Sequence, residues 1–326
     1  MKKKILICGF GFMGQTHCAN ILQNKNATIA GIVNTTGKDG VKPISGNIKT
    51  ASMDWSLLNN IPFFTNLSDC LDNCAFDAAV IATPTATHTA VAHRLLERGK
   101  HIFLEKPLCA TAGEALELLA AGAKTNCIFQ VGHCLRFFPE YQHLSAVYRK
   151  KQYGNLKYLK LVRRTGTPVW GAWKNKDTSL ESITGPVFDL NIHDVDFALK
   201  LLGSPGKITA VKEKYSEKLF RAYWENSSGT VVEIEGGFTE QSAYPFHSGY
   251  TAVFEDAILE YNSLNGGSLI LSDNEKSEPV SLVAQDGYMQ EINAFIKNIC
   301  GEKTEYCPVE EAADAVKVCY QIINAL

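Results

Sequence analysis

Apolar and polar positions follow two alternating patterns in the first third of the chain. Short runs rich in Val, Ile and Leu occur at residues 4–8, 28–34, 77–83 and 101–105. Segments with apolar residues at helical spacing separate them, at residues 13–24, 85–99 and 111–124. Buried strands that alternate with helices are typical of βαβ units in a parallel sheet. We therefore predict an N-terminal α/β domain over residues 1–125.

The pattern changes after about residue 152. The segments there are longer and alternate apolar with polar residues, at 157–166, 207–217, 219–226, 229–240, 251–261 and 268–273. This alternation indicates strands with one covered face and one free face. Two helical segments follow at 287–301 and 309–326. We predict an α+β domain over 126–326 with a large, mostly antiparallel open sheet, and a homodimer or homotetramer formed through its free face.

The segment ITGPVFDLNIHDVDFALKLLG, residues 183–203, is apolar over most of its length but carries a thin polar stripe. On a helix, Asp189, His193, Asp196 and Lys200 fall within an arc of roughly 60°. An ordinary surface helix is apolar over less of its circumference than this one. We interpret the segment as a largely buried helix whose polar stripe lines a cleft, with a solvent-facing stripe as the alternative.

Composition narrows the classes of partner. The chain has 326 residues, of which 45% are hydrophobic and 20% charged, and a net charge of −2. This balance is ordinary for a globular protein and provides no basic surface for nucleic acid. No apolar run is long enough for a signal peptide or a membrane span, so we expect a cytoplasmic protein. None of the ten cysteines forms a CxxC pair, and we expect no metal site.

A glycine motif follows the first predicted strand. KILICGFGFMG places Gly9, Gly11 and Gly14 at the spacing GxGxxG, with Phe12 and Met13 between the last two glycines. In this context the first glycine permits a tight turn, the second lets a pyrophosphate approach the backbone, and the third lets helix and strand pack closely. The anion would then lie at the helix N-terminus. These five residues predict a dinucleotide site in a Rossmann domain.

The second strand ends without the acidic residue that commonly binds the ribose of NAD. Asn34 stands there, followed by Thr35, Thr36 and Lys38. Asn34 can bind a ribose hydroxyl but does not repel a 2′-phosphate. We therefore expect NAD or NADP as cofactor and leave the preference open.

Three further motifs carry a family resemblance. Together, VIATPTATH (80–88), GKHIFLEKP (99–107) and DLNIHDVD (189–196) resemble the glucose–fructose oxidoreductase / inositol dehydrogenase / MocA family. The similarity runs from the glycine motif to the last helices. The resemblance implies an NAD(P)-dependent oxidoreductase that acts on a CH–OH group of a sugar, cyclitol or related polyol.

The resemblance also implies roles for residues of the N-terminal half. Thr83 and Pro84 match a loop that contacts the cofactor, with His88 next in the family pattern. Glu105 and Lys106 match the family's pair near the nicotinamide ribose and the substrate. His88 has an alternative interpretation, in which it opens the following helix and contacts no ligand.

In the second half, Asp189 and His193 match the substrate-binding Asp and the catalytic His of the inositol-dehydrogenase-like branch. Arg136, Trp170 and Trp173 resemble residues that border the active site in some members, so Arg136 and Trp173 are counted with the substrate-binding residues.

These residue types suit hydride transfer, which requires the substrate hydroxyl to lose its proton. An imidazole titrates near neutrality, so His193 would be the general base. Lys106 would stabilise negative charge on oxygen, and Asp189 would hold a neighbouring hydroxyl. Two other functions stay open: a non-catalytic dinucleotide-binding sensor, and an NAD-dependent glycosidase-like hydrolase. His17 belongs to no recognisable constellation in the sequence.

Overall fold

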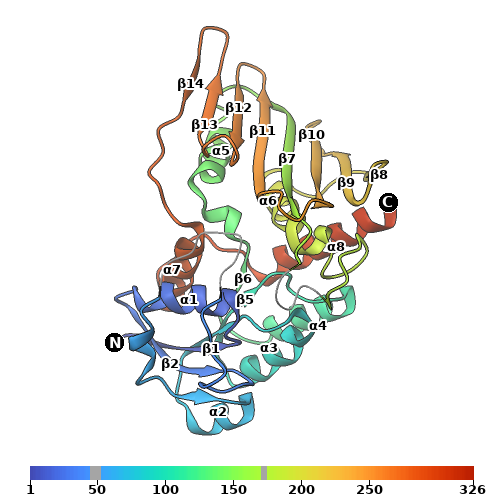
Figure 1. Ribbon diagram of the computed structural model, residues 1–326. Helices are drawn as coiled ribbons and strands as arrows, with labels where there is room; N and C mark the ends of the chain where they lie inside the picture. The colour runs from blue at the N-terminus through green and yellow to red at the C-terminus, as the bar shows by residue number, and fades with distance from the viewer. Residues whose placement is uncertain (45–52, 170–174) are drawn as a thin grey trace. The chain divides into compact units, whose positions relative to one another are not determined.

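Alternating strands and helices build the first unit of the fold, as the hydrophobic pattern predicts. The computed structural model describes residues 1–44, 53–169 and 175–326 and divides into two compact units (Figure 1). The first comprises Met1–Phe137 and Gln285–Ala313, and the second Phe138–Ala284 and Asp314–Leu326. The boundary thus lies after residue 137 rather than 125, and a later segment returns to the first unit.

A six-stranded parallel sheet forms the centre of the first unit, in the order β3-β2-β1-β4-β5-β6. Its strands are β1 (Lys3–Cys8), β2 (Ala27–Val33), β3 (Phe63–Phe64), β4 (Ala78–Ile81), β5 (His101–Glu105) and β6 (Phe129–Gly132). The helices are α1 (Phe12–Leu22), α2 (Leu67–Asn73), α3 (His88–Glu97), α4 (Ala112–Gly122) and α7 (Gly287–Ile299). The predicted α/β Rossmann architecture is therefore confirmed.

One hydrophobic cluster holds α1 and α7 on the same face of this sheet (Figure 1). It joins Ile5 and Ile7 of β1 to Ile21 of α1 and to Phe295 and Ile296 of α7, all fully buried. Because successive side chains of a strand alternate between faces, Leu6 packs on the opposite face. The packing of α7 on this sheet explains why residues 285–313 belong to the first unit.

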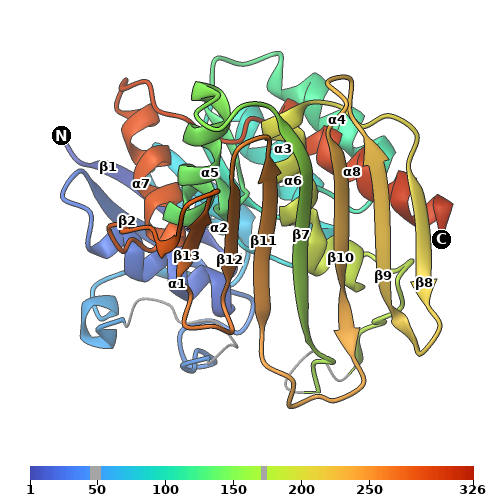
Figure 2. The same ribbon diagram turned by 90° about the horizontal axis from the view of Figure 1, so that it is seen from above.

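The second unit is an eight-stranded sheet with helices on one face (Figure 2). Its strands are β7 (Leu156–Gly166), β8 (Thr209–Glu213), β9 (Ser216–Glu225), β10 (Val231–Thr239), β11 (His247–Phe254), β12 (Ile258–Asn262), β13 (Leu269–Ser272) and β14 (Ser277–Pro279). They follow the order β14-β13-β12-β11-β7-β10-β9-β8, and only β7 and β10 pair in parallel. The helices are α5 (Pro139–Lys150) and α6 (Ile192–Leu202), and α8 (Val309–Ala325) extends into this unit. This arrangement confirms the predicted open, mostly antiparallel sheet.

Two of the expected strands are hairpins instead. The segment 207–217 turns at Lys214 and Tyr215, which separates β8 from β9. The segment 251–261 turns after Phe254, whose backbone N–H donates to the Ala257 carbonyl at 2.8 Å, and so forms β11 and β12. Alternation continues through both turns, so the hydrophobic pattern alone does not mark them. No described helix is long and apolar enough to cross a membrane.

Candidate active site

The glycine turn between β1 and α1 has the close approaches that its motif predicts. Gly9 has a φ of +88°, and a Cβ atom there would lie 2.5 Å from the Ala82 carbonyl oxygen. A Cβ atom on Gly14 would lie 2.1 Å from the Gly9 carbonyl oxygen. Gly11 is the N-cap of α1, and the first turn, which holds Phe12, contains no acidic side chain. The first turn of a helix leaves backbone N–H groups without partners inside the helix, and together with the helix dipole they suit a bound anion.

The turn after β2 is stabilised by Asn34. Its side-chain amide donates to Thr36 Oγ1 at 2.8 Å and to the Gly37 carbonyl at 3.1 Å. Thr35 is exposed in this turn. Since no carboxylate ends β2, the turn presents hydroxyl and amide groups rather than negative charge.

The loop after β4 is linked to the turn after β5 through His88. Its Nε2 lies 2.9 Å from the Thr83 carbonyl and its Nδ1 lies 3.0 Å from the Pro107 carbonyl. The imidazole is buried, and burial lowers its pKa despite these contacts. Both ring nitrogens thus face backbone carbonyls, whereas Pro84 in the same loop is exposed. His88 therefore connects two loops, in keeping with the interpretation in which it contacts no ligand.

Glu105 ends β5 as a buried carboxylate, and a histidine from α1 binds it. His17 Nε2 lies 2.5 Å from Glu105 Oε1, and the Lys106 backbone N–H donates to Oε2 at 3.2 Å. Burial alone would raise the Glu105 pKa, but His17 and Lys106 together bring it below its usual value. The Lys106–Pro107 peptide bond is cis. The sequence analysis missed His17, although it lies one helical turn after Gly14, on the side of α1 that meets the sheet.

The motif DLNIHDVD of the second unit begins in a π-helix. Val187–Asn191 forms this π-helix, and α6 follows from Ile192. The predicted continuous helix over 183–203 is wrong in this part, because residues 182–185 form a turn. The middle of the polar stripe, at His193 and Asp196, is buried, whereas Asp189 and Lys200 at its ends are half-buried.

A neighbouring carboxylate that the sequence analysis did not select anchors this motif. Asp194, fully buried, accepts two hydrogen bonds from the Arg163 guanidinium of β7, at 2.9 and 3.0 Å. Burial raises the Asp194 pKa above its usual value, although Arg163 acts to lower it. Asn191 packs over Gly236 of β10, where a Cβ atom would lie 2.1 Å from the Asn191 side chain. These contacts fix α6 on the sheet and so hold His193 in place.

Arg136, which the resemblance places at the border of the active site, forms an ion pair within the first unit. Arg136 is buried in the first unit, and its Nη1 lies 2.5 Å from Glu311 Oε2 and 3.3 Å from the Tyr306 carbonyl. Trp170 and Trp173 lie outside the described residues.

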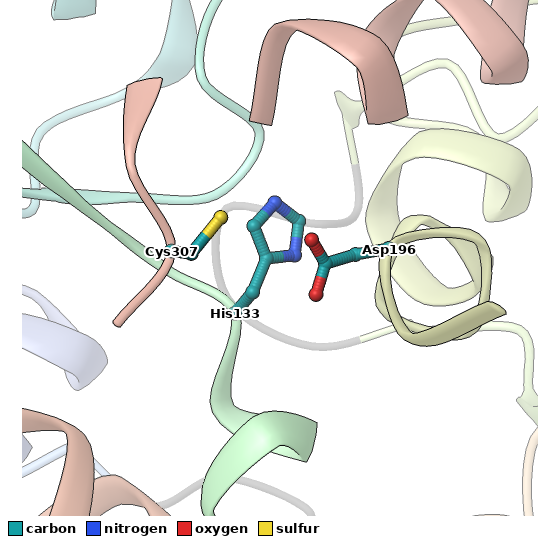
Figure 3. Close-up of side chains that lie close together, drawn as sticks. All are labelled: His133, Asp196 and Cys307. Carbon is teal, nitrogen blue, oxygen red and sulfur yellow. The ribbon is translucent and has the colours of Figure 1, made fainter. Parts of the chain in front are cut away.

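Further histidine and cysteine side chains come together in the first unit. The His133 imidazole and the Cys307 thiol are buried and have ligand-type atoms within 4.8 Å of each other (Figure 3). The Val131 backbone N–H donates to the Cys307 carbonyl at 2.9 Å, which joins β6 to the segment before α8. Asp196, also labelled in Figure 3, belongs to α6 of the second unit.

Comparison with known proteins gives a consistent picture. Residues 3–133 match the sequence model of GFO_IDH_MocA, an oxidoreductase family with an NAD-binding Rossmann fold. The chain is 30% identical to the uncharacterized oxidoreductase YrbE of Bacillus subtilis over 217 residues, which are 66% of this chain and 58% of YrbE. It is 31% identical to an inositol 2-dehydrogenase of Rhodococcus jostii over 251 residues, which are 74% of this chain and 63% of that protein. These matches thus span less than two thirds of either relative.

A solved structure extends the likeness to the whole fold. UDP-N-acetylglucosamine 3-dehydrogenase GnnA from Acidithiobacillus ferrooxidans has a TM-score of 0.80 against this chain at 21% identity. The superposition covers 100% of this chain and 98% of GnnA, so the second unit also has the fold of that protein.

Proposed function

We propose that the chain belongs to the glucose–fructose oxidoreductase / inositol dehydrogenase / MocA family and that it is an NAD(P)-dependent dehydrogenase or reductase of a sugar, cyclitol or related polyol. The observation that carries the proposal is the edge of the parallel sheet. The glycine turn, the Thr83 loop and the Lys106 turn follow β1, β4 and β5, which are neighbours in the sheet. Loops after adjacent parallel strands share one edge, where ligands of such folds bind.

The glycine turn fits a dinucleotide on physical grounds. Its backbone N–H groups and the N-terminus of α1 would bind the pyrophosphate, and the missing Cβ atoms of Gly9 and Gly14 permit the close packing of the turn. The ribose would lie near Asn34. The bound nicotinamide would supply or accept the hydride, and the protein would supply position and electrostatics.

Three side chains would handle the substrate. Lys106 would stabilise negative charge on the reacting oxygen, because an ammonium group is a compact point charge. His193 would take the hydroxyl proton in oxidation and return it in reduction. Asp189 would bind a neighbouring hydroxyl. This assignment is supported by the hydrogen bond of Lys106 N–H to Glu105 and by the burial of His193.

The experiment begins with fluorescence titrations of the purified protein with NAD, NADH, NADP and NADPH. A screen of sugars and cyclitols with the preferred cofactor follows. Lys106→Met should abolish turnover and leave dinucleotide affinity within about threefold, and His193→Ala should lower kcat by about 10²-fold or more. Normal turnover in Lys106→Met would remove that residue from the mechanism.

The titrations also separate the two other functions. Binding without consumption of cofactor on any polyol would indicate a sensor. Release of a free sugar with no net change of cofactor would indicate a hydrolase. If none of the four dinucleotides binds, the proposed function is wrong.

We also propose a homodimer or homotetramer formed through the sheet face opposite α5 and α6 (Figure 2). That face carries a network of ion pairs, in which Lys160 Nζ lies 3.2 Å from a carboxylate oxygen of Glu233 and 2.6 Å from one of Glu235. Paired charges of this kind can pack against a second copy without leaving an isolated buried charge. Sedimentation equilibrium should give a mass of at least twice 35.8 kDa, and a monomer would contradict this arrangement.

A further inference from the structure

Three ionisable side chains of the first unit lie close together at the end of β5, next to the Glu105–Lys106 turn. His17 comes from α1, Glu105 from the end of β5 and Glu291 from α7, and one ligand-type atom of each lies within 4.8 Å of the others. His17 and Glu291 have no exposed surface, and Glu105 is 6% exposed. The proposed hydride-transfer chemistry uses neither His17 nor Glu291.

The hydrogen bonds of this cluster leave Glu291 unsatisfied. His17 and Glu105 bind each other, whereas neither carboxyl oxygen of Glu291 nor His17 Nδ1 has a hydrogen-bond partner among the described residues. An ionised carboxylate in this position would have lost its hydration without gaining a donor, and a second carboxylate stands beside it. Burial, followed by the charges of Glu105 and Asp286, raises the Glu291 pKa well above its usual value.

Among the described residues, the charged groups on α7 and on the elements packed against it include two cations besides the histidines, and Lys297 is exposed on the surface of α7. The neighbours of α7 are α1, β5, the 3₁₀-helix Cys134–Phe137 and β6, whose Gln130 Nε2 donates to the Glu291 backbone carbonyl at 2.9 Å. Their titratable and charged groups, with those of α7 itself, are His17, Cys18, His101, Glu105, Cys134, Arg136, Asp286, Tyr288 and Lys297. Of these, the Arg136 guanidinium is already bound to Glu311 at 2.5 Å.

We propose that Glu291 is a positioning residue that holds a proton in the folded protein and thereby keeps Glu105 and the Lys106 turn in place. As a neutral acid, Glu291 can donate to Glu105 or to His17 Nδ1, the unsatisfied acceptor within the cluster. Loss of the proton puts two carboxylates side by side in a dry site, and repulsion displaces Glu105. The Lys106 backbone N–H is bound to Glu105, so the turn moves with it. The effect on turnover rests on the proposed function of Lys106.

The test compares the wild-type protein with Glu291→Gln, because an amide has the shape of the protonated acid and cannot ionise. Glu302→Gln is the control, since Glu302 is an exposed carboxylate just after α7. Unfolding by urea is measured between pH 5 and pH 9. The folded wild-type chain binds the Glu291 proton more tightly than the unfolded chain, so its stability falls as pH rises. We therefore compare the unfolding equilibrium constants of the wild type and Glu291→Gln. Their ratio should grow by up to tenfold per pH unit above about pH 4.3, the usual pKa of a glutamate in the unfolded chain, and should stop growing above the pKa of Glu291 in the folded chain.

A second readout follows the Lys106 turn itself. Above the Glu291 pKa, kcat/KM of the wild type should fall by about tenfold per pH unit, and Glu291→Gln should lose this alkaline decline while keeping its kcat at pH 7 within about threefold. Glu302→Gln should match the wild type in both measurements. If Glu291 had a merely structural role, Glu291→Gln would change the stability of the protein but would keep the alkaline decline of kcat/KM.

Parallel pH dependences of unfolding in the wild type and Glu291→Gln would overturn the proposal. So would one equivalent of a metal ion in the purified wild type that is absent from Glu291→Gln, because the cluster would then be a metal site. If Glu291→Gln does not fold, the infrared spectrum of the wild type decides, and the absence at pH 7 of a buried, protonated carboxyl band refutes the proposal. A failure to bind any dinucleotide would remove the proposed function, while the unfolding comparison would still test the proton.

Discussion

Removal of either partner of the buried Arg163–Asp194 pair should strongly destabilise the second unit. Asp194 has no exposed surface, Arg163 is 4% exposed, and two hydrogen bonds of 2.9 and 3.0 Å join them. Breaking such a pair leaves an uncompensated buried charge, which costs about 3–5 kcal/mol. We therefore expect Asp194→Asn and Arg163→Met each to lower the free energy of unfolding by about this amount. The double variant should cost less than the sum, because it leaves no charge unpaired.

The same unit supplies a matched control. Lys212 and Glu181 form an ion pair at 2.7 Å, but their side chains are 41% and 52% exposed. Lys212→Met should therefore cost no more than about 1 kcal/mol. Urea unfolding followed by tryptophan fluorescence measures all four variants, and Trp224 of β9 is a buried probe in this sheet. The reasoning is refuted if the Arg163 and Asp194 variants lose no more stability than Lys212→Met.

The pH dependence of Arg163→Met provides an internal check. Burial already holds the Asp194 pKa above its usual value in the presence of Arg163. Without the guanidinium this pKa rises further, so the folded state binds a proton that the unfolded chain has released. The destabilisation of Arg163→Met should consequently grow as pH rises above about 3.9.

Two further changes test the nucleotide half. Gly14→Ala should weaken dinucleotide binding by at least about tenfold, because its Cβ atom would lie 2.1 Å from the Gly9 carbonyl and α1 must shift away from β1. Gly113→Ala of α4 is the control, with its nearest atom at 3.9 Å, and unchanged affinity in both variants would contradict the packing argument. Asn34→Asp should shift the ratio of NAD to NADP dissociation constants toward NAD by about tenfold, the effect of about 1.4 kcal/mol of charge repulsion. An unchanged ratio in fluorescence titrations would show that the 2′-position does not lie near Asn34.

Local patterns predicted the elements whose causes are local. Period-two and helical spacing located β1, β2, β4 and β5 of the parallel sheet, the helices α1, α3 and α4, and most strands of the open sheet, because each pattern reflects which face is buried. The short strand β3 and the helix α2 were not predicted. The glycine spacing predicted the turn at Gly9, because the close backbone contacts of such a turn leave no room for a Cβ atom and therefore require glycine. The roles of Lys106, Asp189 and His193 came from family resemblance and remain proposals.

The features that the sequence patterns did not predict depend on contacts between segments that are distant in the sequence or on local departures from regular helix geometry. A helical wheel assumes 100° per residue, and the π-helix Val187–Asn191 breaks that phase. The partner of Glu105 is His17, 88 positions away, and Asp194 finds Arg163 at a separation of 31. Such pairings depend on sheet order and helix packing, which no single window of sequence contains.

The return of α7 to the first sheet also shapes how the chain can fold during synthesis. Ile292, Phe295 and Ile296 complete the cluster around Ile5 and Ile7, but they are translated after all the strands of the second unit. The first unit emerges first yet cannot close its core until residue 299 has been translated, so an exposed apolar face must persist in the meantime. For protein engineering, exchange of this unit between relatives requires two separate segments of chain, because residues 1–137 alone lack α7, which together with α1 covers one face of the sheet.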